Sequence, residues 1–212
     1  MQEQRARHFS PQLMLDVAAL EAIVGVAALI IDMQEDFFAH ERLVQRRAKL
    51  SRGVNELVAI CRRNGVDVIW VKQEFSPDLS DAMLEARRKS IRVVISGTPG
   101  ASILSELDFR PSDHLVVKKR YSAFFGTKLD ELLATLGTTT LIVAGINTHA
   151  CVRMAVVDAY QRDYEVILAR ECIESYDAEH HDVSWRYMDG KLGRAMGNEQ
   201  ILTVLAGATE KG

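Results

Sequence analysis

The sequence predicts a three-layer α/β/α sandwich on a mostly parallel, six-stranded sheet of the Rossmann-like kind. Two observations support it: short apolar runs typical of buried strands, and amphipathic stretches with helical spacing that alternate with them along the chain. Strands that alternate with helices pair in parallel through right-handed crossovers, so helices cover both faces of the sheet. A chain of 212 residues without repeats or a Pro/Gly/Ser-rich linker is expected to form one domain, 1–212.

The elements follow from the spacing of apolar residues and from stop signals such as Gly65 and Gly137. A helix at 11–23 forms an N-terminal helical extension within residues 1–25, and residues 74–112 form a long excursion near the functional edge of the sheet. The predicted strands are 26–32, 66–71, 114–117, 139–144, 165–169 and 201–205. The remaining predicted helices are 43–63, 81–89, 129–136, 148–162 and 178–191.

Composition narrows the classes of partner. Hydrophobic residues make up 48% and charged residues 26% of the chain, and the formal net charge is −3, as in an ordinary globular protein. Without a basic stripe we expect no nucleic-acid partner, and without a long apolar run we expect no membrane partner. Three widely spaced cysteines form neither a CxxC pair nor a disulfide framework, which favours reduced thiols and a cytoplasmic protein.

Three chemically useful residues lie where predicted strands end. Asp32 ends the first strand, Lys118 ends the third, and Cys151 lies in the first turn of the helix after the fourth. The carboxyl ends of parallel strands meet at one edge of a sheet, where ligands bind. Singly, such residues are more often a cap, a solvated side chain and a small buried hydrophobe. Together, they predict a catalytic group.

The chemistry expected of Cys151 is that of a nucleophile. A thiol reacts as the thiolate, which a helix N-terminus and a nearby lysine stabilise. Asn147 or Thr148 is expected to cap this helix, and backbone N–H groups of the same turn could form an oxyanion hole.

Four segments with these residues resemble a known family. They are Ile30-Ile-Asp-Met-Gln-Glu-Asp-Phe37, Gly97-Thr-Pro-Gly100, the run from Lys118 to Thr127, and Gly145-Ile-Asn-Thr-His-Ala-Cys-Val152. Their order and spacing resemble the isochorismatase-like hydrolase superfamily, in particular its cysteine hydrolase branch of N-carbamoylsarcosine amidohydrolases and nicotinamidase-related enzymes. The resemblance extends over about residues 26–205.

The resemblance implies roles for these residues. Asp32 is then the general base and acid, Lys118 the motif lysine and Cys151 the nucleophile. A non-proline cis peptide is implied at Ile146–Asn147, with the N–H groups of Asn147 and Cys151 facing the oxyanion. The implied reaction is hydrolysis of a C–N bond in a small amide or ureido compound through a thioester, in a homodimer or homotetramer.

Departures from the family bear on the substrate. Nicotinamidases carry metal-binding histidines after the second strand, whereas this chain has Trp70-Val-Lys-Gln-Glu-Phe-Ser-Pro77, so we expect no metal and no cofactor. Isochorismatases proper lack the cysteine. Isochorismatase or nicotinamidase activity, a catalytically idle binding or assembly subunit, and a redox-sensing thiol are the alternatives.

Residues near these motifs have less specific signals. Phe37 and Tyr121 are candidate walls of a substrate pocket. His149 is expected at the substrate channel or an interface, because two positions along a helix place it away from Cys151. His180 and His181 are expected on a solvated face. Cys61 and Cys172, the second following the fifth strand, are expected to be buried.

Overall fold

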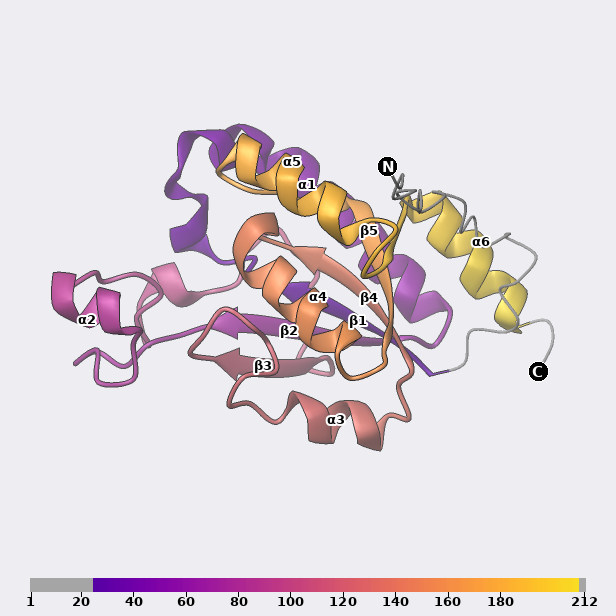
Figure 1. Cartoon of the computed structure of the whole chain (residues 1–212), viewed down its shortest axis with the longest axis horizontal. Coiled ribbons are helices and arrows are strands. Elements are labelled where there is room, and N and C mark those ends of the chain that lie inside the picture. The colour runs from indigo at the N-terminus through magenta and orange to yellow at the C-terminus, as the bar shows by residue number, and fades with distance from the viewer. Residues whose placement is uncertain (1–24, 210–212) are drawn as a thin grey trace, which may run out of the picture.

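Six strands form one parallel sheet in the computed structural model, which describes residues 25–209 (Figure 1). The order of the strands across the sheet is β3-β2-β1-β4-β5-β6. The helix predicted at 11–23, and with it most of the N-terminal extension, lies outside the described residues. The strands are β1 Val26–Ile31, β2 Asp67–Gln73, β3 His114–Lys118, β4 Thr140–Gly145, β5 Glu165–Ile173 and β6 Arg194–Met196.

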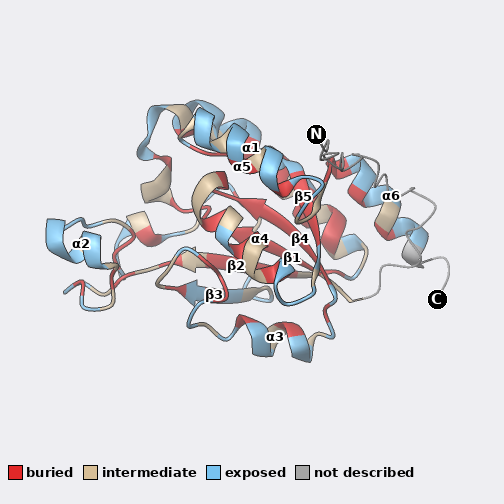
Figure 2. Ribbon diagram, viewed as in Figure 1, coloured by how far each residue is buried: buried red, intermediate tan, exposed pale blue. Residues whose placement is uncertain are grey.

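Strand β1 is the centre of the sheet. Ala28 lies opposite Val68 of β2 on one side and opposite Ile142 of β4 on the other. All residues of β1 after Val26 are buried, as are all residues of β4, because helices cover both faces (Figure 2). A continuous apolar strand is therefore stable here, as expected for a parallel sheet.

Helices lie on both faces, so the predicted three-layer sandwich is confirmed. Leu50 and Val54 of one layer pack with the β1 side chains Ala28 and Ile30, and the opposite layer packs with Ala27 and Leu29. One layer holds α1 Glu41–Arg63 and α6 Asn198–Thr209, and the other holds α3 Leu129–Thr135, α4 Arg153–Tyr160 and α5 Ala178–Met188.

The prediction of a strand at 201–205 is wrong, because this segment lies within α6 and the sixth strand is β6. Ile201 and Leu205 are buried four residues apart, whereas Leu202 between them is exposed, which is the period of a helix rather than a strand. The short apolar run is compatible with both structures, and the segment just before it supplies β6 at the edge of the sheet.

Several further boundaries differ from expectation: α2 begins at Leu84 rather than at 81, α5 ends at Met188 rather than at 191, and β2 extends to Gln73. Two other differences concern the cysteines. The helix predicted at 148–162 begins with a π-helical turn, η4, at Thr148–Val152, and only then continues as α4. Strand β5 extends four residues further than predicted, so Cys172 lies within it rather than after it. Cys172 and Cys61 are both buried, as predicted.

The excursion after β2 has a small hydrophobic core of its own and projects beside the sheet, with helix α2 Leu84–Lys89 at its tip (Figure 1). Gln34 joins it to the sheet: its side-chain amide donates to the carbonyls of Gln73 and Ala101, and its Oε1 accepts from the Gln73 N–H. Asp36 accepts from the Val94 N–H at 2.6 Å. Two side chains of the 34–36 segment therefore fix where the excursion starts and returns.

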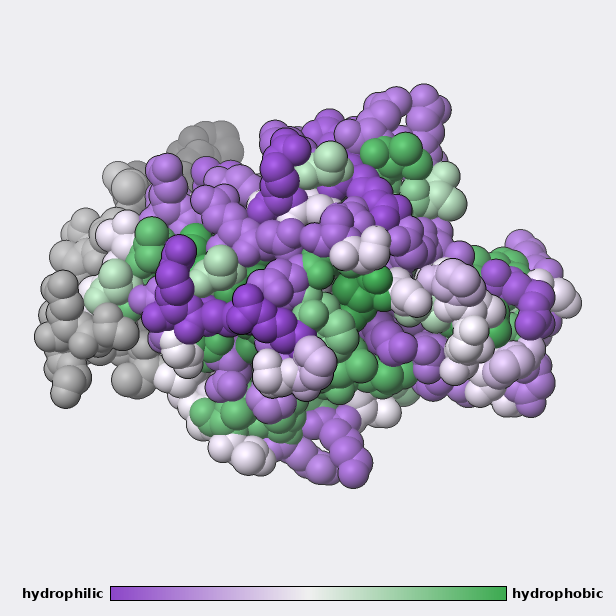
Figure 3. Space-filling view, turned by 180° about the vertical axis from the view of Figure 1, so that it is seen from behind, coloured by the Kyte–Doolittle hydropathy of each residue, from purple (hydrophilic) through white to green (hydrophobic). Residues whose placement is uncertain are grey.

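The view from behind shows a mostly hydrophilic surface interrupted by hydrophobic groups across its middle and lower part (Figure 3). On the edge strand β3, Leu115 and Val117 are among the exposed apolar side chains. None of the helices within residues 25–209 combines the length and apolar character that crossing a membrane requires.

Candidate active site

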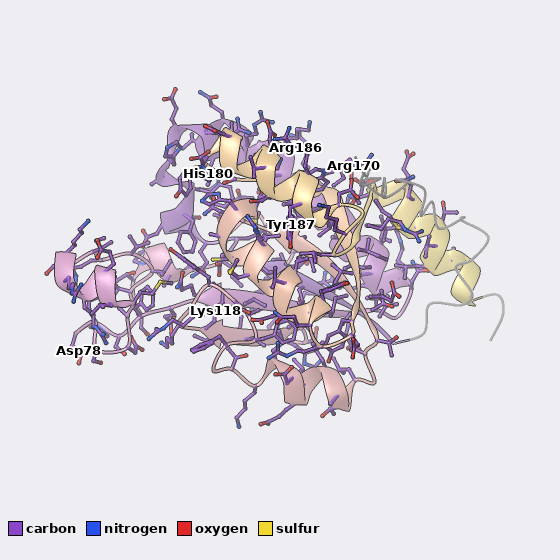
Figure 4. The ribbon with its side chains drawn as sticks, viewed as in Figure 1. Asp78, Lys118, Arg170, His180, Arg186 and Tyr187 are labelled. Carbon is purple, nitrogen blue, oxygen red and sulfur yellow. The ribbon has the colours of Figure 1, made fainter. Side chains whose placement is uncertain are left out.

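The three residues predicted at strand ends come together at one edge of the sheet. Asp32 follows β1, Lys118 is the last residue of β3 (Figure 4), and Cys151 lies in η4 after β4. The Lys118 Nζ is 2.7 Å from Asp32 Oδ2 and 3.4 Å from Cys151 Sγ. One ammonium group therefore contacts both a carboxylate and a thiol.

The local backbone places Asp32 against the turn that carries the cysteine. Asp32 adopts a left-handed conformation with φ of 54°, which aspartate tolerates better than most residues. Its N–H donates to the Val71 carbonyl, and the Ile146 N–H donates to the Ile31 carbonyl at 3.0 Å. The ends of β1, β2 and β4 are thus tied together directly beside the site.

Lys118 is fully buried and Asp32 is 1% exposed. Burial alone disfavours the charged lysine, but the charges of Asp32 and Cys151 and their hydrogen bonds outweigh it and raise the Lys118 pKa. The ammonium also donates to the Arg120 carbonyl at 3.1 Å. The Lys118 ammonium group is therefore held in place by three partners.

Asp32 uses only one of its carboxylate oxygens. Oδ2 accepts from Lys118, whereas Oδ1 is buried without a hydrogen-bond partner among the residues that the structure describes. Burial raises the pKa of Asp32, and the Lys118 charge and hydrogen bonds from Cys151 and Lys118 act in the opposite direction. A buried acceptor without a partner is costly, which makes Oδ1 the natural recipient of a proton or a substrate N–H.

The pKa of the Cys151 thiol is raised above its ordinary value. Burial is the largest cause of its raised pKa, the Asp32 charge raises it further, and Lys118 opposes both. The sequence had led us to expect a helix N-terminus and a lysine to favour a thiolate. Desolvation outweighs them here, because Cys151 is only 5% exposed. The carboxylate adjacent to this thiol is that of Asp32.

The turn before Cys151 contains a cis peptide bond between Ile146 and Asn147. Gly145, at the end of β4, has a φ of 118°, and any side chain there would collide with the backbone of Ile31. Asn147 precedes η4 but does not cap it through its side chain, contrary to expectation. Its Oδ1 accepts instead from the Tyr176 N–H.

The segment after β5 makes hydrogen bonds to the turn that carries Cys151. Sequence patterns did not indicate these contacts. The Thr148 N–H donates to the Glu174 carbonyl at 3.0 Å, and Thr148 Oγ1 and His181 Nδ1 are hydrogen-bonded at 2.7 Å. His149 Nδ1 is hydrogen-bonded to Ser175 Oγ, also at 2.7 Å. Residues after β5 thus form hydrogen bonds with both Thr148 and His149, although they are far from them in sequence.

The prediction of a solvated face is wrong for His181 and right for its neighbour. The His180 side chain is 66% exposed and paired with Asp177, whereas the His181 side chain is 19% exposed and bonded to Thr148. Adjacent helical residues point in different directions, so only one of the two histidines faces the sheet.

The two pocket candidates have different surroundings. Phe37 is half-buried and packs against both the main core and the small core of the excursion. Tyr121 is half exposed, three residues beyond Lys118. Phe37 has a packing role whatever else it does, and both stay candidates for a substrate pocket.

Two carboxylates of the segment after β2 form ion pairs with lysines of the neighbouring strands or their ends. Lys72 lies 2.6 Å from Glu74, and Lys119 lies 2.8 Å from Asp81. Lys119 therefore points away from the Asp32–Cys151 pair, as the alternation of side chains along a strand predicts. Across residues 25–209, no group of three or more His, Cys, Asp and Glu side chains is placed to hold a metal ion.

A parallel α/β/α sandwich with an aspartate, a lysine and a cysteine gathered at one edge of the sheet is typical of the class of hydrolase to which this chain is similar. The family model of the isochorismatase domain matches residues 26–200, so the chain belongs to the isochorismatase family of hydrolases. The resemblance identified from the four sequence motifs is thereby confirmed.

Two relatives show the range of this family. A protein of Arabidopsis thaliana described as a probable inactive nicotinamidase is 37% identical over 147 residues, covering 66% of this chain and 75% of the relative. The maleamate amidohydrolase of Pseudomonas putida is 26% identical over 151 residues, covering 70% of this chain and 71% of the enzyme.

Solved structures show the same fold. A cysteine hydrolase from Pseudomonas syringae has a TM-score of 0.79 at 21% identity, covering 86% of this chain and 93% of that one. The N-carbamoylsarcosine amidase of Thermoplasma acidophilum has a TM-score of 0.69 at 25% identity, with 82% and 96% covered.

Proposed function

We propose that the chain is a metal-independent cysteine amidohydrolase that cleaves the C–N bond of a small amide or ureido compound through a thioester. The observation that supports this most strongly is the convergence of Lys118 on both Asp32 and Cys151, with Asp32 Oδ1 left as a buried acceptor. The nucleophile, the base and a fixed cation are the three parts that such a reaction needs.

The first half of the reaction forms the thioester. As Cys151 Sγ attacks the carbonyl carbon, Asp32 accepts the thiol proton, so the raised pKa of the thiol is no obstacle. The oxyanion that forms accepts hydrogen bonds from the N–H groups of Asn147 and Cys151. The C–N bond then breaks, and Asp32 returns the proton to the leaving nitrogen, which departs as ammonia or an amine.

The second half restores the enzyme. A water molecule attacks the thioester carbonyl and gives a proton to Asp32. The C–S bond breaks, the acid product leaves, and Asp32 returns the proton to Cys151. Lys118 stays charged throughout. Asp32 alternates between its anionic and its neutral form beside this constant cation.

Metal independence is supported by the ion pairs after β2. Metal ligation by Glu74 or Asp81 would require each carboxylate to give up a lysine at 2.6 or 2.8 Å. A bound divalent ion would also place its charge beside those lysines, which is unfavourable.

The direct test is ammonia release from a panel of small amides, ureido acids and nicotinamide, with and without a chelator. We expect release that resists the chelator and is lost in Cys151→Ala but kept in Cys172→Ala, which removes a second buried thiol. Release that requires a metal, or persists in Cys151→Ala, would contradict the proposal.

The second candidate function is a catalytically idle binding or assembly subunit, which the description of the Arabidopsis thaliana relative as probably inactive favours. The same panel of amide, ureido and nicotinamide substrates distinguishes an amidohydrolase from an idle subunit. If no compound is hydrolysed and Cys151 reacts with iodoacetamide no faster than a buried control thiol, the idle subunit is the better account. Turnover of nicotinamide alone would instead support the nicotinamidase alternative.

A further inference from the structure

Glu174, the residue after β5, is a buried carboxylate outside the Asp32–Lys118–Cys151 group. Its side chain accepts hydrogen bonds from Arg42 Nη2 at 3.0 Å and from the Ser175 N–H at 2.9 Å, and it pairs with Arg46 Nε at 3.1 Å. Both arginines belong to α1. Because buried charges need such partners, Glu174 has a fixed position between α1 and the sheet.

The backbone of Glu174 brackets the turn that leads to the cysteine. Its N–H donates to the Gly145 carbonyl at 3.3 Å, and its carbonyl accepts from the Thr148 N–H at 3.0 Å. The two bonds join the last residue of β4 to the first residue of η4. Any movement of Glu174 therefore displaces the turn between them.

His181 joins the same carboxylate to the same turn through side chains. Its Nδ1 lies 2.7 Å from Thr148 Oγ1 and 3.8 Å from Glu174 Oε1. The ring stacks on Trp185 of α5 with an angle of 17° between the planes, which limits its orientation. Thr148 is fully buried, so its hydroxyl depends on this partner rather than on water.

Glu174, His181 and Thr148, which we call the relay, adjoin the nucleophile without touching it. Thr148 is three residues before Cys151 in the same π-helical turn, so its side chain restrains the rotation of that turn. The distance that depends on this restraint is the 3.4 Å between Cys151 Sγ and Lys118 Nζ. Misplacement of a reacting group by about 1 Å can lower a rate about 100-fold.

We propose that the relay positions Cys151 against Lys118 and Asp32, which makes Glu174, His181 and Thr148 positioning residues of this site. The inference rests on the proposed function in that it takes Cys151 as the nucleophile. It adds Glu174 and His181, which the sequence motifs do not include, and gives a positioning role to Thr148, which they do. It also connects the reactivity of Cys151 to helix α1 through Arg42 and Arg46.

The test is the pH profile of alkylation of Cys151 by iodoacetamide, a probe that needs no knowledge of the substrate. Thr148→Val removes the hydroxyl and keeps the shape, whereas Thr148→Ser keeps the hydroxyl. The matched control is Thr138→Val, since Thr138 is also buried but its Oγ1 has no hydrogen-bond partner among the described residues and it lies at the opposite end of β4.

We expect alkylation at a given pH below the midpoint to slow about ten-fold in Thr148→Val, because the thiolate loses part of its interaction with Lys118 and the midpoint rises by about one pH unit. Thr148→Ser and Thr138→Val should keep the wild-type profile. With a substrate in hand, kcat should fall about ten-fold in Thr148→Val while KM stays within about two-fold. A wild-type profile in a folded Thr148→Val variant would overturn the proposal.

Two further measurements keep the test decisive. If Thr148→Val does not fold, His181→Phe removes the ring nitrogen but preserves the stacking on Trp185, and the same shift is expected of it. Cys151→Ala establishes which thiol is labelled. Labelling that persists in Cys151→Ala would count against the proposed nucleophile, whereas labelling that is lost there but unchanged in the relay variants would count against the relay alone.

Discussion

Lys118 and Asp32 form an ion pair from which water is excluded, with Nζ 2.7 Å from Oδ2 and neither side chain more than 2% exposed. Removing water from two charges costs free energy, which their mutual attraction and further hydrogen bonds must offset. The pair is therefore best understood as a device that fixes the geometry around Cys151 rather than as a source of stability.

Breaking this pair on one side should destabilise the protein strongly. Lys118→Met leaves a buried, uncompensated carboxylate, so we expect a loss of about 3–5 kcal/mol in the free energy of unfolding. The Asp32→Asn/Lys118→Met double variant should be less destabilised than the sum of the single variants by about 1–3 kcal/mol. Urea unfolding of the four proteins measures both quantities.

The exposed pair between Lys89 and Glu85 is the control, since both side chains are more than 60% exposed. Lys89→Met should change the free energy of unfolding by about 0.5 kcal/mol or less. Strictly additive effects of the two buried substitutions would contradict the coupling between Asp32 and Lys118.

Replacing Asp32 should have opposite effects on ionisation and on turnover. The Asp32 charge raises the pKa of Cys151, so Asp32→Asn should lower the midpoint of alkylation by iodoacetamide. The same variant lacks the proton acceptor and should hydrolyse amides at least about 100-fold more slowly. In the wild type, the rate of alkylation should still be rising above pH 9, because the ordinary pKa of a thiol is 9.0 and that of Cys151 is higher.

A profile that is already flat at pH 8 in the wild type would show a preformed thiolate and contradict this account. Cys151→Ala serves as the blank for both measurements.

Gly145 should tolerate no side chain. Its φ of 118° and the nearby Ile31 backbone exclude a Cβ atom, so Gly145→Ala should cost about 3 kcal/mol or more and displace the turn before Cys151. Gly126→Ala is the matched control: Gly126 also has a positive φ but open space around it, and should cost about 1–2 kcal/mol. Thermal unfolding compares them, and equal costs would show that the contact with Ile31 does not matter.

Acid should weaken the attachment of α1 to the excursion. Hydrogen bonds from Arg47 are the main cause that lowers the Glu106 pKa from 4.5 to about 2. A carboxyl with a lowered pKa stabilises the fold above its unfolded value, and this stability disappears as pH falls from about 4.5 to about 2.

The side chain of Glu106 is 36% exposed, so after screening we expect about 0.5–1 kcal/mol from this pair. Glu106→Gln should remove that part of the acid sensitivity, measured as the difference in urea unfolding between pH 5 and pH 2.5. An unchanged difference in the variant would place the acid sensitivity elsewhere.

Sequence patterns predicted those parts of the molecule that depend on local periodicity and on strand ends. The sheet and the positions of Asp32, Lys118 and Cys151 could be inferred, because parallel strands bring their carboxyl ends to one edge. The identity of Ile201–Leu205 could not, because a five-residue apolar run fits a strand or a helix and its neighbours in space decide.

Glu174 and His181 were missed for a different reason. Their importance comes from contacts with Thr148 and with α1 across more than 25 residues of chain, and no spacing pattern encodes such contacts. The raised pKa of Cys151 was missed because desolvation depends on everything that covers the thiol, whereas a sequence shows only its neighbours along the chain.

The excursion after β2 is a part of the molecule whose outer surface can vary over evolutionary time. Its side chains pack among themselves, and it is joined to the sheet through Gln34 and Asp36 and through contacts of Glu74 and Asp81 with residues 118–120. Mutations on its outer surface can therefore accumulate without moving Asp32 or Lys118. Sequence change on this outer surface and the geometry of the Asp32–Lys118–Cys151 group are therefore mechanically separate.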